Sequence, residues 1–400
     1  FFVLLVLNVP ISVCLGLSSA AAILYSGTSL TIVATNIYSG ISKFLLLAIP
    51  FFVLSGNIMA KAGISTRLIR FVDTCVGHRK GGIANVCIIV ACFFGAISGS
   101  GPATVAALGA VLIPAMVERG GFSAAFSTAL MATSSSIAIV IPPSIAFVVY
   151  ASITGVSIGD MFMAGIIPGI LMGLALVVVV MLEVRRNHVV PSTVEKASAK
   201  ERWNAFKDAF WGFLMPVIIL GGIYGGIFTP TEAAAVSVVY GLFVGMIIYK
   251  EVKFKDLWEI LIDSAKTTGG IMLIIGAATL FSYVCTVFGI AQAAQALLLE
   301  ISGNKYIFLL IVNVIFLIAG CFVDANSAMY IFIPIMYPVA TQLGIDPVHF
   351  GVIATVNLAI GQVTPPVGVN LFVAIGVSEK LQGLRDKTKV TIVSMSKAVW

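Results

Sequence analysis

The sequence contains one unusual pattern twice: an apolar arm, a short polar tip, a second apolar arm, and then a long apolar segment interrupted by two consecutive prolines. In the first copy the tip is Ser98-Gly99-Ser100-Gly101-Pro102 and the interruption is Pro142-Pro143. In the second copy they are Asp324-Ala325-Asn326-Ser327 and Pro365-Pro366. Polar, helix-breaking sequence at membrane depth is tolerated only where it is buried in protein or lines a cavity. Because it occurs in both halves, the pattern indicates the binding site of a membrane transporter.

The composition supports this reading. The chain is 60% hydrophobic and only 10% charged, whereas soluble globular proteins carry about 25% charged residues. We therefore predict an all-α polytopic membrane protein, with room in its 400 residues for roughly ten membrane segments. Basic loops beside apolar segments explain the net charge of +6, so the expected partner is the lipid bilayer and not nucleic acid. The scattered cysteines and histidines predict neither a disulfide framework nor a metal cluster.

Hydropathy places the helices approximately. Apolar spans are predicted at 1–25, 41–62, 122–154, 159–184, 209–228, 231–249, 269–288 and 347–377, and interfacial amphipathic helices at 63–80, 250–268 and 289–305. The first span is read as a helix whose start lies upstream. In the hairpins 83–117 and 306–338 each arm has about 15 residues, or roughly 22 Å of helix, which is short of the roughly 30 Å membrane core. Both hairpins are therefore predicted to be re-entrant.

The loop charges give the predicted orientation of the chain. If both hairpins are re-entrant, all 23 Lys and Arg except Lys43 and Lys305 fall on one face, which is then cytoplasmic. An odd number of crossings separates the hairpins, so the two copies are inverted repeats with a shared site near the bilayer midplane. The resulting organisation is scaffold helices and an interfacial arm (1–80), a first repeat core (81–184), a cytoplasmic linker (185–208), scaffold helices and arms (209–305), a second repeat core (306–378) and a tail (379–400).

The first repeat supplies candidate ligands for a small cation. The helix 122–154 would be about 50 Å long if continuous, and Pro142-Pro143 must break it. A break frees backbone carbonyls that suit a cation and exposes a half-helix N-terminus that suits an anion. We assign sodium binding to the hydroxyls of Ser98 and Ser100 and to Val140 and Pro142 at the break. The alternative is that these small residues only permit close helix packing.

In the second repeat, Asp324 is the only acidic residue in the hairpin 306–338. An ionisable residue inside the membrane is a functional hypothesis by default, and Asp324 could bind a cation, relay a proton or accept a substrate hydroxyl. The alternative is a helix-capping aspartate. Further predicted sodium ligands in this repeat are Asn326, Gly361, Thr364 and Pro365. The predicted substrate-binding residues are Ser100, Ser134, Ser144, Asp324, Asn357 and Asn370, where Ser134 and Asn357 occupy equivalent positions in the two repeats.

Four spaced motifs resemble a known family. They are Gly99-Ser100-Gly101-Pro102-Ala103-Thr104, Ile141-Pro142-Pro143-Ser144, the segment Phe228-Thr229-Pro230-Thr231-Glu232-Ala233-Ala234-Ala235, and Thr364-Pro365-Pro366-Val367-Gly368. Over about residues 1–378 the chain resembles the large membrane subunit of tripartite ATP-independent periplasmic (TRAP) transporters. It departs from that family in its polar, basic tail 380–400, where the family has another apolar helix.

The resemblance implies a transporter and not an enzyme. It implies import of an organic carboxylate coupled to two or more Na⁺ ions, an elevator-type moving domain, and location in the bacterial inner membrane. It also implies a small four-helix membrane partner, for which upstream fusion would explain the missing start, and a periplasmic substrate-binding protein. The chain looks most like sialic acid transporters, with a C4-dicarboxylate or another carboxylate as the alternative.

Two other classes of protein were weighed. An intramembrane serine protease with Ser98 or Ser100 as nucleophile needs a general base within hydrogen-bond reach, but neither His nor Lys lies in the apolar part of either repeat. A passive channel would need no ion gradient and would not saturate. The sequence also lacks the G-x-x-x-x-G-K-S/T phosphate-binding loop, which fits a device driven by an ion gradient.

Overall fold

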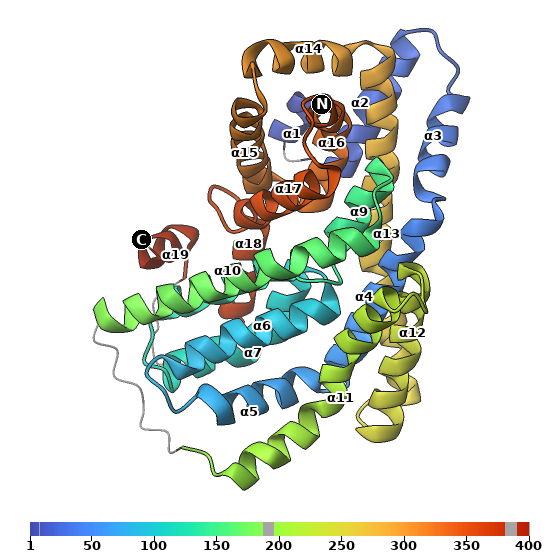
Figure 1. Ribbon diagram of the computed structural model, residues 1–400. Coiled ribbons are helices and arrows are strands. Elements are labelled where there is room, and N and C mark those ends of the chain that lie inside the picture. The colour runs from blue at the N-terminus through green and yellow to red at the C-terminus, as the bar shows by residue number, and fades with distance from the viewer. Residues whose placement is uncertain (8, 187–195, 381–389, 400) are drawn as a thin grey trace.

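The computed structural model describes residues 1–7, 9–186, 196–380 and 390–399, and this part of the chain contains helices but no strands. In the first half (Figure 1) the helices are α1 (Phe2–Val6), α2 (Ile11–Tyr25), α3 (Thr31–Ile41), η1 (Phe44–Leu47), α4 (Ala48–Lys61), α5 (Ile64–Val76), α6 (Gly82–Ser98), α7 (Gly101–Glu118), α8 (Ala124–Ser136), η2 (Ile137–Ile139), α9 (Ile145–Thr154) and α10 (Ile158–Arg186). In the second half they are α11 (Ala199–Tyr224), α12 (Pro230–Leu242), the π-helix η3 (Phe243–Ile248), α13 (Phe254–Val287), α14 (Ile290–Ser302), α15 (Lys305–Phe322), α16 (Ala325–Gln342), α17 (Pro347–Gly361), α18 (Val369–Glu379) and α19 (Ile392–Val399).

The described residues include seven helical segments that are long and apolar enough to cross a membrane. Together with the helical architecture, they confirm the predicted fold class of an all-α polytopic membrane protein. Side chains such as Ile167 and Val217 are more than 60% exposed on two of these helices, which suits contact with lipid.

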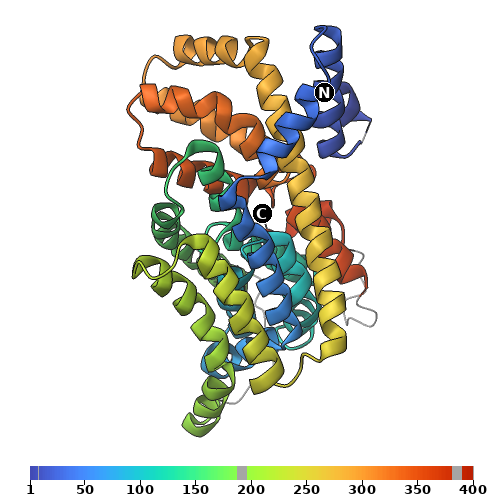
Figure 2. The ribbon, with the colours of Figure 1, turned by 90° about the vertical axis from the view of Figure 1, so that its right-hand side faces the viewer.

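Several predicted boundaries are wrong. The expected single helix 1–25 is divided between α1 and α2, and Pro10 lies directly before α2 because it lacks the N–H that a continuous helix needs. Helix α3, from 31 to 41, was not predicted at all. The segments 250–268 and 269–288, expected as an interfacial helix and a separate crossing, form one helix α13 of 34 residues, about 51 Å long. No proline interrupts α13, and α13 runs alongside α2, α3 and α4 (Figures 1 and 2).

The linker and the tail also differ from the expected ranges. Helix α10 continues to Arg186 and α11 begins at Ala199, where Ser198 and Glu201 form a reciprocal capping box. Residues 187–195 of the predicted linker and 381–389 of the tail lie outside the described residues. The tail ends in the short helix α19, which packs against α8 through the buried side chain of Met395.

Each repeat contains a helical hairpin followed by an interrupted helix. The first hairpin is α6 and α7 and the second is α15 and α16, with arms of 17, 18, 18 and 18 residues. These arms, about 26–27 Å long, are longer than the roughly 22 Å that was estimated from the sequence for arms of about 15 residues. Arm length alone therefore does not decide whether the hairpins are re-entrant, which stays a prediction from the loop charges.

The two repeats pack into each other. Helix α9, which follows the first break, packs on α16, and the Ser152 and Tyr330 hydroxyls lie 2.8 Å apart. The Tyr150 hydroxyl donates to the Pro347 carbonyl at 2.6 Å. Reciprocally, α18 follows the second break and packs on α7 and α8 of the first repeat. The hairpins and interrupted helices of both repeats therefore form one body.

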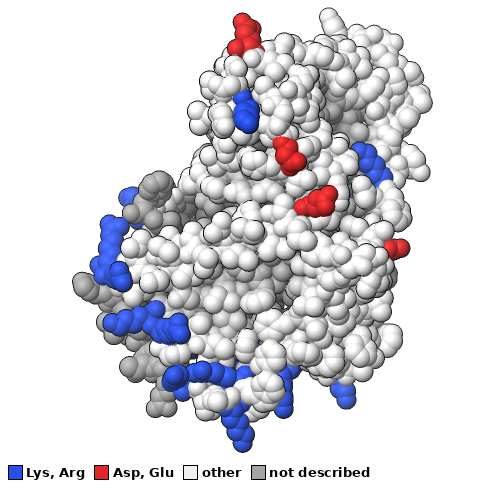
Figure 3. Space-filling view, viewed as in Figure 1, with Lys and Arg blue, Asp and Glu red and all other residues white. Residues whose placement is uncertain are grey.

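Charged side chains are distributed unevenly along the molecule. In Figure 3, Lys and Arg gather along the lower and left margins, over the ends of α10 and α11, whereas Asp and Glu lie mainly in the upper half. We call the first region, which includes Arg185 and Arg186 at the end of α10, the basic end. Its position is consistent with the predicted cytoplasmic face.

Candidate ion and substrate site

Both predicted breaks are present, at equivalent positions 223 residues apart in the sequence (142 to 365). In the first, helical structure stops after Ile139 and resumes at Ile145, and in the second it stops after Gly361 and resumes at Val369. Both double prolines are joined by a cis peptide bond. Proline has no N–H to donate, so each break leaves backbone carbonyls that are not used within a helix.

Each hairpin tip is bonded to the break of its own repeat. The Ile145 amide donates to the Gly99 carbonyl at 3.4 Å, and the Gly368 amide donates to the Cys321 carbonyl at 3.0 Å. The two donors, Ile145 and Gly368, are related by the same offset of 223 as the double prolines. The tips and breaks thus form two equivalent units.

The first tip gathers oxygen atoms. The Ser98 hydroxyl lies 2.9 Å from the Thr104 hydroxyl, which donates to the Ser100 carbonyl at 2.9 Å. Gly99 has a left-handed backbone (φ +61°), and a Cβ there would lie 2.8 Å from the Pro143 carbonyl oxygen, so the position requires glycine. These neutral oxygens are ligands of the kind that a hard monovalent cation prefers. Thr104 was not predicted as a site residue, although the motif from Gly99 contains it.

The other predicted residues of the first repeat lie deeper. Ser144 is fully buried and caps α9: its hydroxyl accepts from the Phe147 amide and donates to the Ile139 carbonyl. Ser134 is fully buried within α8. The Val140 carbonyl oxygen would lie 2.5 Å from a Cβ at Gly165, so it faces α10. Pro142 is buried in the break itself. The structure therefore brings Ser98 and Ser100 together at the tip, with Ser144 in the adjoining break. Ser134 lies instead beside Cys87 of α6, and Val140 faces α10.

At the second tip, Asp324 caps α16. Its carboxylate accepts from the amides of Asn326 at 3.0 Å and Ser327 at 3.2 Å, and from the Ser327 hydroxyl. Asp324 therefore has the helix-capping role, which was the alternative prediction for this residue. An ionised carboxylate has about four lone-pair sites, so the Asp324 carboxylate can still bind a cation while it caps α16. The carboxylate is only partly buried, and the nearby Asn326 Oδ1 is buried without a hydrogen bond to any residue that the structure describes.

The second break carries buried polar atoms that lack partners. Asn370 is fully buried, and neither its Oδ1 nor its Nδ2 is hydrogen-bonded within the described structure; Gln362 Oε1 is in the same situation. A Cβ at Gly101 would lie 2.7 Å from Asn370 Nδ2, so this side chain reaches the start of α7 in the first repeat. Leaving a buried polar group unpaired costs about 1–3 kcal/mol, and a polar ligand between the repeats would offset that cost.

The remaining predicted residues of the second repeat, except Pro365, have contacts within that repeat. Asn357 donates to Asn313 Oδ1 at 2.7 Å, which joins α17 to α15. Gly361 faces Gly320 at close range, because a Cβ at Gly361 would lie 2.6 Å from the Gly320 Cα. Thr364 donates to the Ile360 carbonyl at 2.7 Å, and Pro365 is exposed. Asn313 was missed because an isolated asparagine in an apolar run carries no break or motif signal.

A cavity of about 390 Å³ adjoins the first tip. Its polar lining residues are Asn57, Ser98, Ser100 and Thr267, and the others are Val53, Gly56, Ala60, Phe94, Ala103, Ala106, Ala107, Ile145 and Ile271. Asn57 of α4 also donates to the Ser264 hydroxyl of α13 at 2.8 Å. Two of the lining residues, Ala60 and Thr267, are the sequence neighbours of Lys61 and Lys266. Sequence reasoning missed Asn57 and Thr267 because both lie on helices without a break.

The whole chain, residues 1–400, matches the family described as tripartite ATP-independent periplasmic transporter, DctM component. The chain belongs to this family. It is 40% identical over 413 residues to the C4-dicarboxylate TRAP transporter large permease protein DctM of Rhodobacter capsulatus, covering 99% of this chain and 91% of that protein.

Two other DctM-family relatives carry different names. The isethionate TRAP transporter permease protein DctMQ of Oleidesulfovibrio alaskensis is 41% identical over 400 residues, covering 100% of this chain and 63% of that protein. The sialic acid TRAP transporter large permease protein SiaM of Vibrio cholerae is 38% identical over 360 residues, covering 90% of this chain and 84% of that protein. All three relatives are named as permeases and not as enzymes, and they confirm the resemblance to the large TRAP membrane subunit.

The donor set of this DctM chain fits an alkali cation better than a transition metal. The described residues hold no group of three or more His, Cys, Asp or Glu side chains that could bind a metal ion. Hydroxyl, amide and carbonyl oxygens dominate both tips, with a single carboxylate at Asp324. Such oxygens suit a hard cation and do not select transition metals.

Proposed function

We propose that this large TRAP subunit imports an organic anion together with Na⁺, by an elevator movement of the body formed by the two hairpins and interrupted helices. The observation that carries the proposal is the pairing of each oxygen-rich tip with a helix break. Helix ends and free carbonyls at such breaks hold both ions and carboxylates in secondary transporters. The cavity beside Ser98 and Ser100 supports an inward-open arrangement, with the basic end in the cytoplasm of the bacterial cell and the body in its inner membrane.

The charge of the cavity favours one substrate class. Among the described residues, its lining contains neither Lys, Arg nor His, so a substrate carboxylate would be neutralised mainly by bound Na⁺ and by helix N-termini. A second carboxylate would need a second counter-charge in the same space. We therefore favour a monocarboxylate with several hydroxyl groups, such as sialic acid, over a C4-dicarboxylate, although relatives of both names match this chain.

The proposed assembly has three components. The family description is tripartite, and we propose a small membrane subunit and a periplasmic substrate-binding protein as the other two. The DctMQ relative extends beyond the part matched here, since the chain covers 63% of it. That extra length supports fusion of the small subunit as one arrangement for this family.

Uptake should require inward Na⁺. With one carboxylate at the tips, the site offers ligands for a cation and no chain of titratable groups for a proton. The measurement is uptake of labelled sialic acid or succinate into vesicles that contain all three components, with a Na⁺ gradient or a proton gradient alone. Equal uptake driven by protons in Na⁺-free buffer would refute the coupling, and non-saturable flux without any gradient would indicate a channel.

Replacing Ser98 by Ala should weaken Na⁺ binding and leave the maximum rate nearly unchanged. The substitution removes a buried neutral hydroxyl that lies 2.9 Å from Thr104. Losing one such ligand costs about 1–2 kcal/mol, which raises the Na⁺ concentration for half-maximal uptake about 5- to 30-fold. Ser18→Ala is the matched control, because Ser18 donates to a backbone carbonyl within α2, far from both tips in sequence. An unchanged Na⁺ dependence in Ser98→Ala would remove Ser98 from the site.

A further inference from the structure

Two short helices connect the scaffold to the hairpins. Helix α5 leads into the first hairpin and α14 into the second, and each has 13 residues. Each follows a glycine with a left-handed backbone, Gly63 (φ +68°) and Gly289 (φ +70°). We call α5 and α14 the arm helices. They occupy equivalent places in the two repeats, but their attachments differ.

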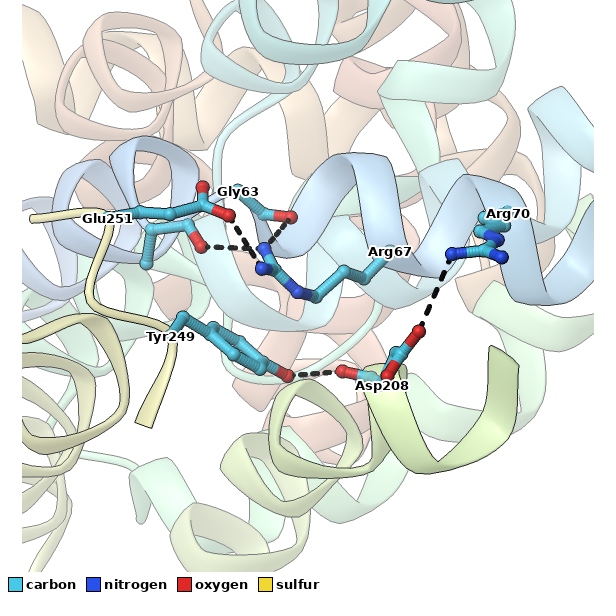
Figure 4. A network of polar contacts seen from close by, with 7 residues as sticks. Gly63, Arg67, Arg70, Asp208, Tyr249 and Glu251 are labelled. Carbon is cyan, nitrogen blue, oxygen red and sulfur yellow. Dashed lines mark hydrogen bonds and ion pairs between the residues drawn. The ribbon is translucent and has the colours of Figure 1, made fainter. Parts of the chain in front are cut away.

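Arg67 fastens α5 to its surroundings (Figure 4). Its guanidinium donates to Glu251 at 2.5 Å and to the carbonyls of Ala62 at 3.2 Å and Gly63 at 3.0 Å. It also lies over the Tyr249 ring, 3.9 Å from the centroid. The Arg67 side chain is only 24% exposed. A planar guanidinium that is both stacked and hydrogen-bonded loses little freedom per bond, so it holds its partners firmly.

Tyr249 and Glu251, the partners of Arg67, lie in a turn that backbone hydrogen bonds hold in place. After the π-helix η3, Lys250 is the one non-glycine residue with a positive φ (+56°) in the described chain, and the amides of Glu251 and Val252 both bond to the Gly245 carbonyl. The Tyr249 hydroxyl donates to the Asp208 carbonyl of α11, and burial raises the pKa of Tyr249 to about 12, so it stays a donor. Arg67 thereby joins α5 to α11 and to the turn before α13.

Two further ion pairs extend this attachment. Arg70 of α5 lies 3.5 Å from Asp208, on the scaffold side. At the other end of α5, Asp73 pairs with Arg119, the residue after α7, at 2.9 Å. Helix α5 is thus held to the scaffold at one end and to the base of the first hairpin at the other.

Helix α14 has none of these attachments among the described residues. No ion pair involves residues 289–302 in the described structure, and the side chains of Ile290, Leu297 and Ile301 are each more than 50% exposed. In the described structure, the Gln292 side chain donates a hydrogen bond to the Thr286 carbonyl at 3.3 Å, next to the start of α14. Helix α14 also has packing contacts with α15 and α16 of the second hairpin.

We propose that Arg67 is a positioning residue that makes α5 a stiff connector, which sets the place of the first hairpin relative to the scaffold, while α14 is the compliant connector of the second hairpin. The inference rests on the proposed transport function for its kinetic consequence, but the stiffness of the two arms is a separate property. When the body of the two repeats moves, α5 would then turn as a rigid unit, and α14 would accommodate most of the distortion between the body and the scaffold.

Hydrogen exchange of the purified protein in lipid nanodiscs tests the stiffness directly. In the unaltered protein, amides in 64–76 should exchange about 10-fold more slowly than those in 290–302. Arg67→Ala should remove that difference without changing 290–302, and Arg67→Lys should restore it only in part. Lys61→Ala is the matched control, since Lys61 pairs with Glu259 between two scaffold helices, α4 and α13. Equal exchange in both arms, or no response to Arg67→Ala, would overturn the proposal.

Transport kinetics test the positioning role. Arg67→Ala should lower the maximum uptake rate about 10-fold and leave the half-saturating concentrations of Na⁺ and substrate within about twofold, because the tips keep their ligands. A shift in those concentrations at an unchanged maximum rate would contradict the role. If Arg67→Ala does not fold, Glu251→Gln removes the same ion pair at constant size. If hydrogen exchange gives the expected results but no Na⁺-dependent uptake is measured, the proposed function is refuted. The stiffness of α5 is then still supported.

Discussion

Asp324→Asn should reduce Na⁺-dependent uptake about 100-fold or more, because removing the charged partner of a partly buried cation costs about 3 kcal/mol or more. The structure makes this variant unusually informative. Asp324 accepts from the amides of Asn326 and Ser327 as the cap of α16, and asparagine caps helices about as well as aspartate. The substitution therefore removes the charge and preserves the cap.

Asp346→Asn is the control for this experiment. Asp346 caps α17 by accepting from the His349 amide at 2.8 Å, and it lies in neither tip. Its substitution by Asn should leave uptake within about twofold, since the cap is again retained. Uptake is measured in vesicles over a range of Na⁺ concentrations. If Asp324→Asn transports normally with an unchanged Na⁺ dependence, Asp324 is a structural cap and the second tip lacks the proposed cation site.

Gly361→Ala should destabilise the second repeat by about 3 kcal/mol, at the upper end for overpacking, because the added methyl meets backbone and not a flexible side chain. A Cβ at Gly361 would lie 2.6 Å from the Gly320 Cα and 3.0 Å from the Leu317 carbonyl oxygen. Helix α17 must then move away from α15. That movement displaces the second break from the second tip, so uptake should fall together with stability.

Thermal unfolding in detergent and uptake in vesicles measure the two effects of Gly361→Ala. Gly376→Ala in α18 is the matched control, because a Cβ there meets nothing within 4 Å and alanine is favoured in a helix by about 0.5–1 kcal/mol. The control should unfold at the same or a higher temperature. Unaltered unfolding of Gly361→Ala would show that α15 and α17 are not closely packed at this point.

The sequence by itself determined the class of protein and the position of its unusual segments. Composition excludes a soluble chain, because 10% charged residues cannot cover a water-exposed surface. The breaks at Pro142-Pro143 and Pro365-Pro366 were predictable because a missing N–H is a local property that tertiary packing does not restore. The motifs around these breaks were also sufficient to indicate the TRAP family, which the comparisons confirm.

Only the tertiary structure decided how the two repeats combine. The approach of Asn370 to Gly101 and the hydrogen bond of Tyr150 to the Pro347 carbonyl join residues far apart in the chain, and hydropathy and motif patterns describe neighbours in sequence only. The same limit applies to α13, whose two halves differ in polarity although one helix contains both. It applies to Asp324 as well: the residue type allowed either a cap or a cation ligand, and the cap became visible only when the backbone placed the amides of Asn326 and Ser327 against its carboxylate.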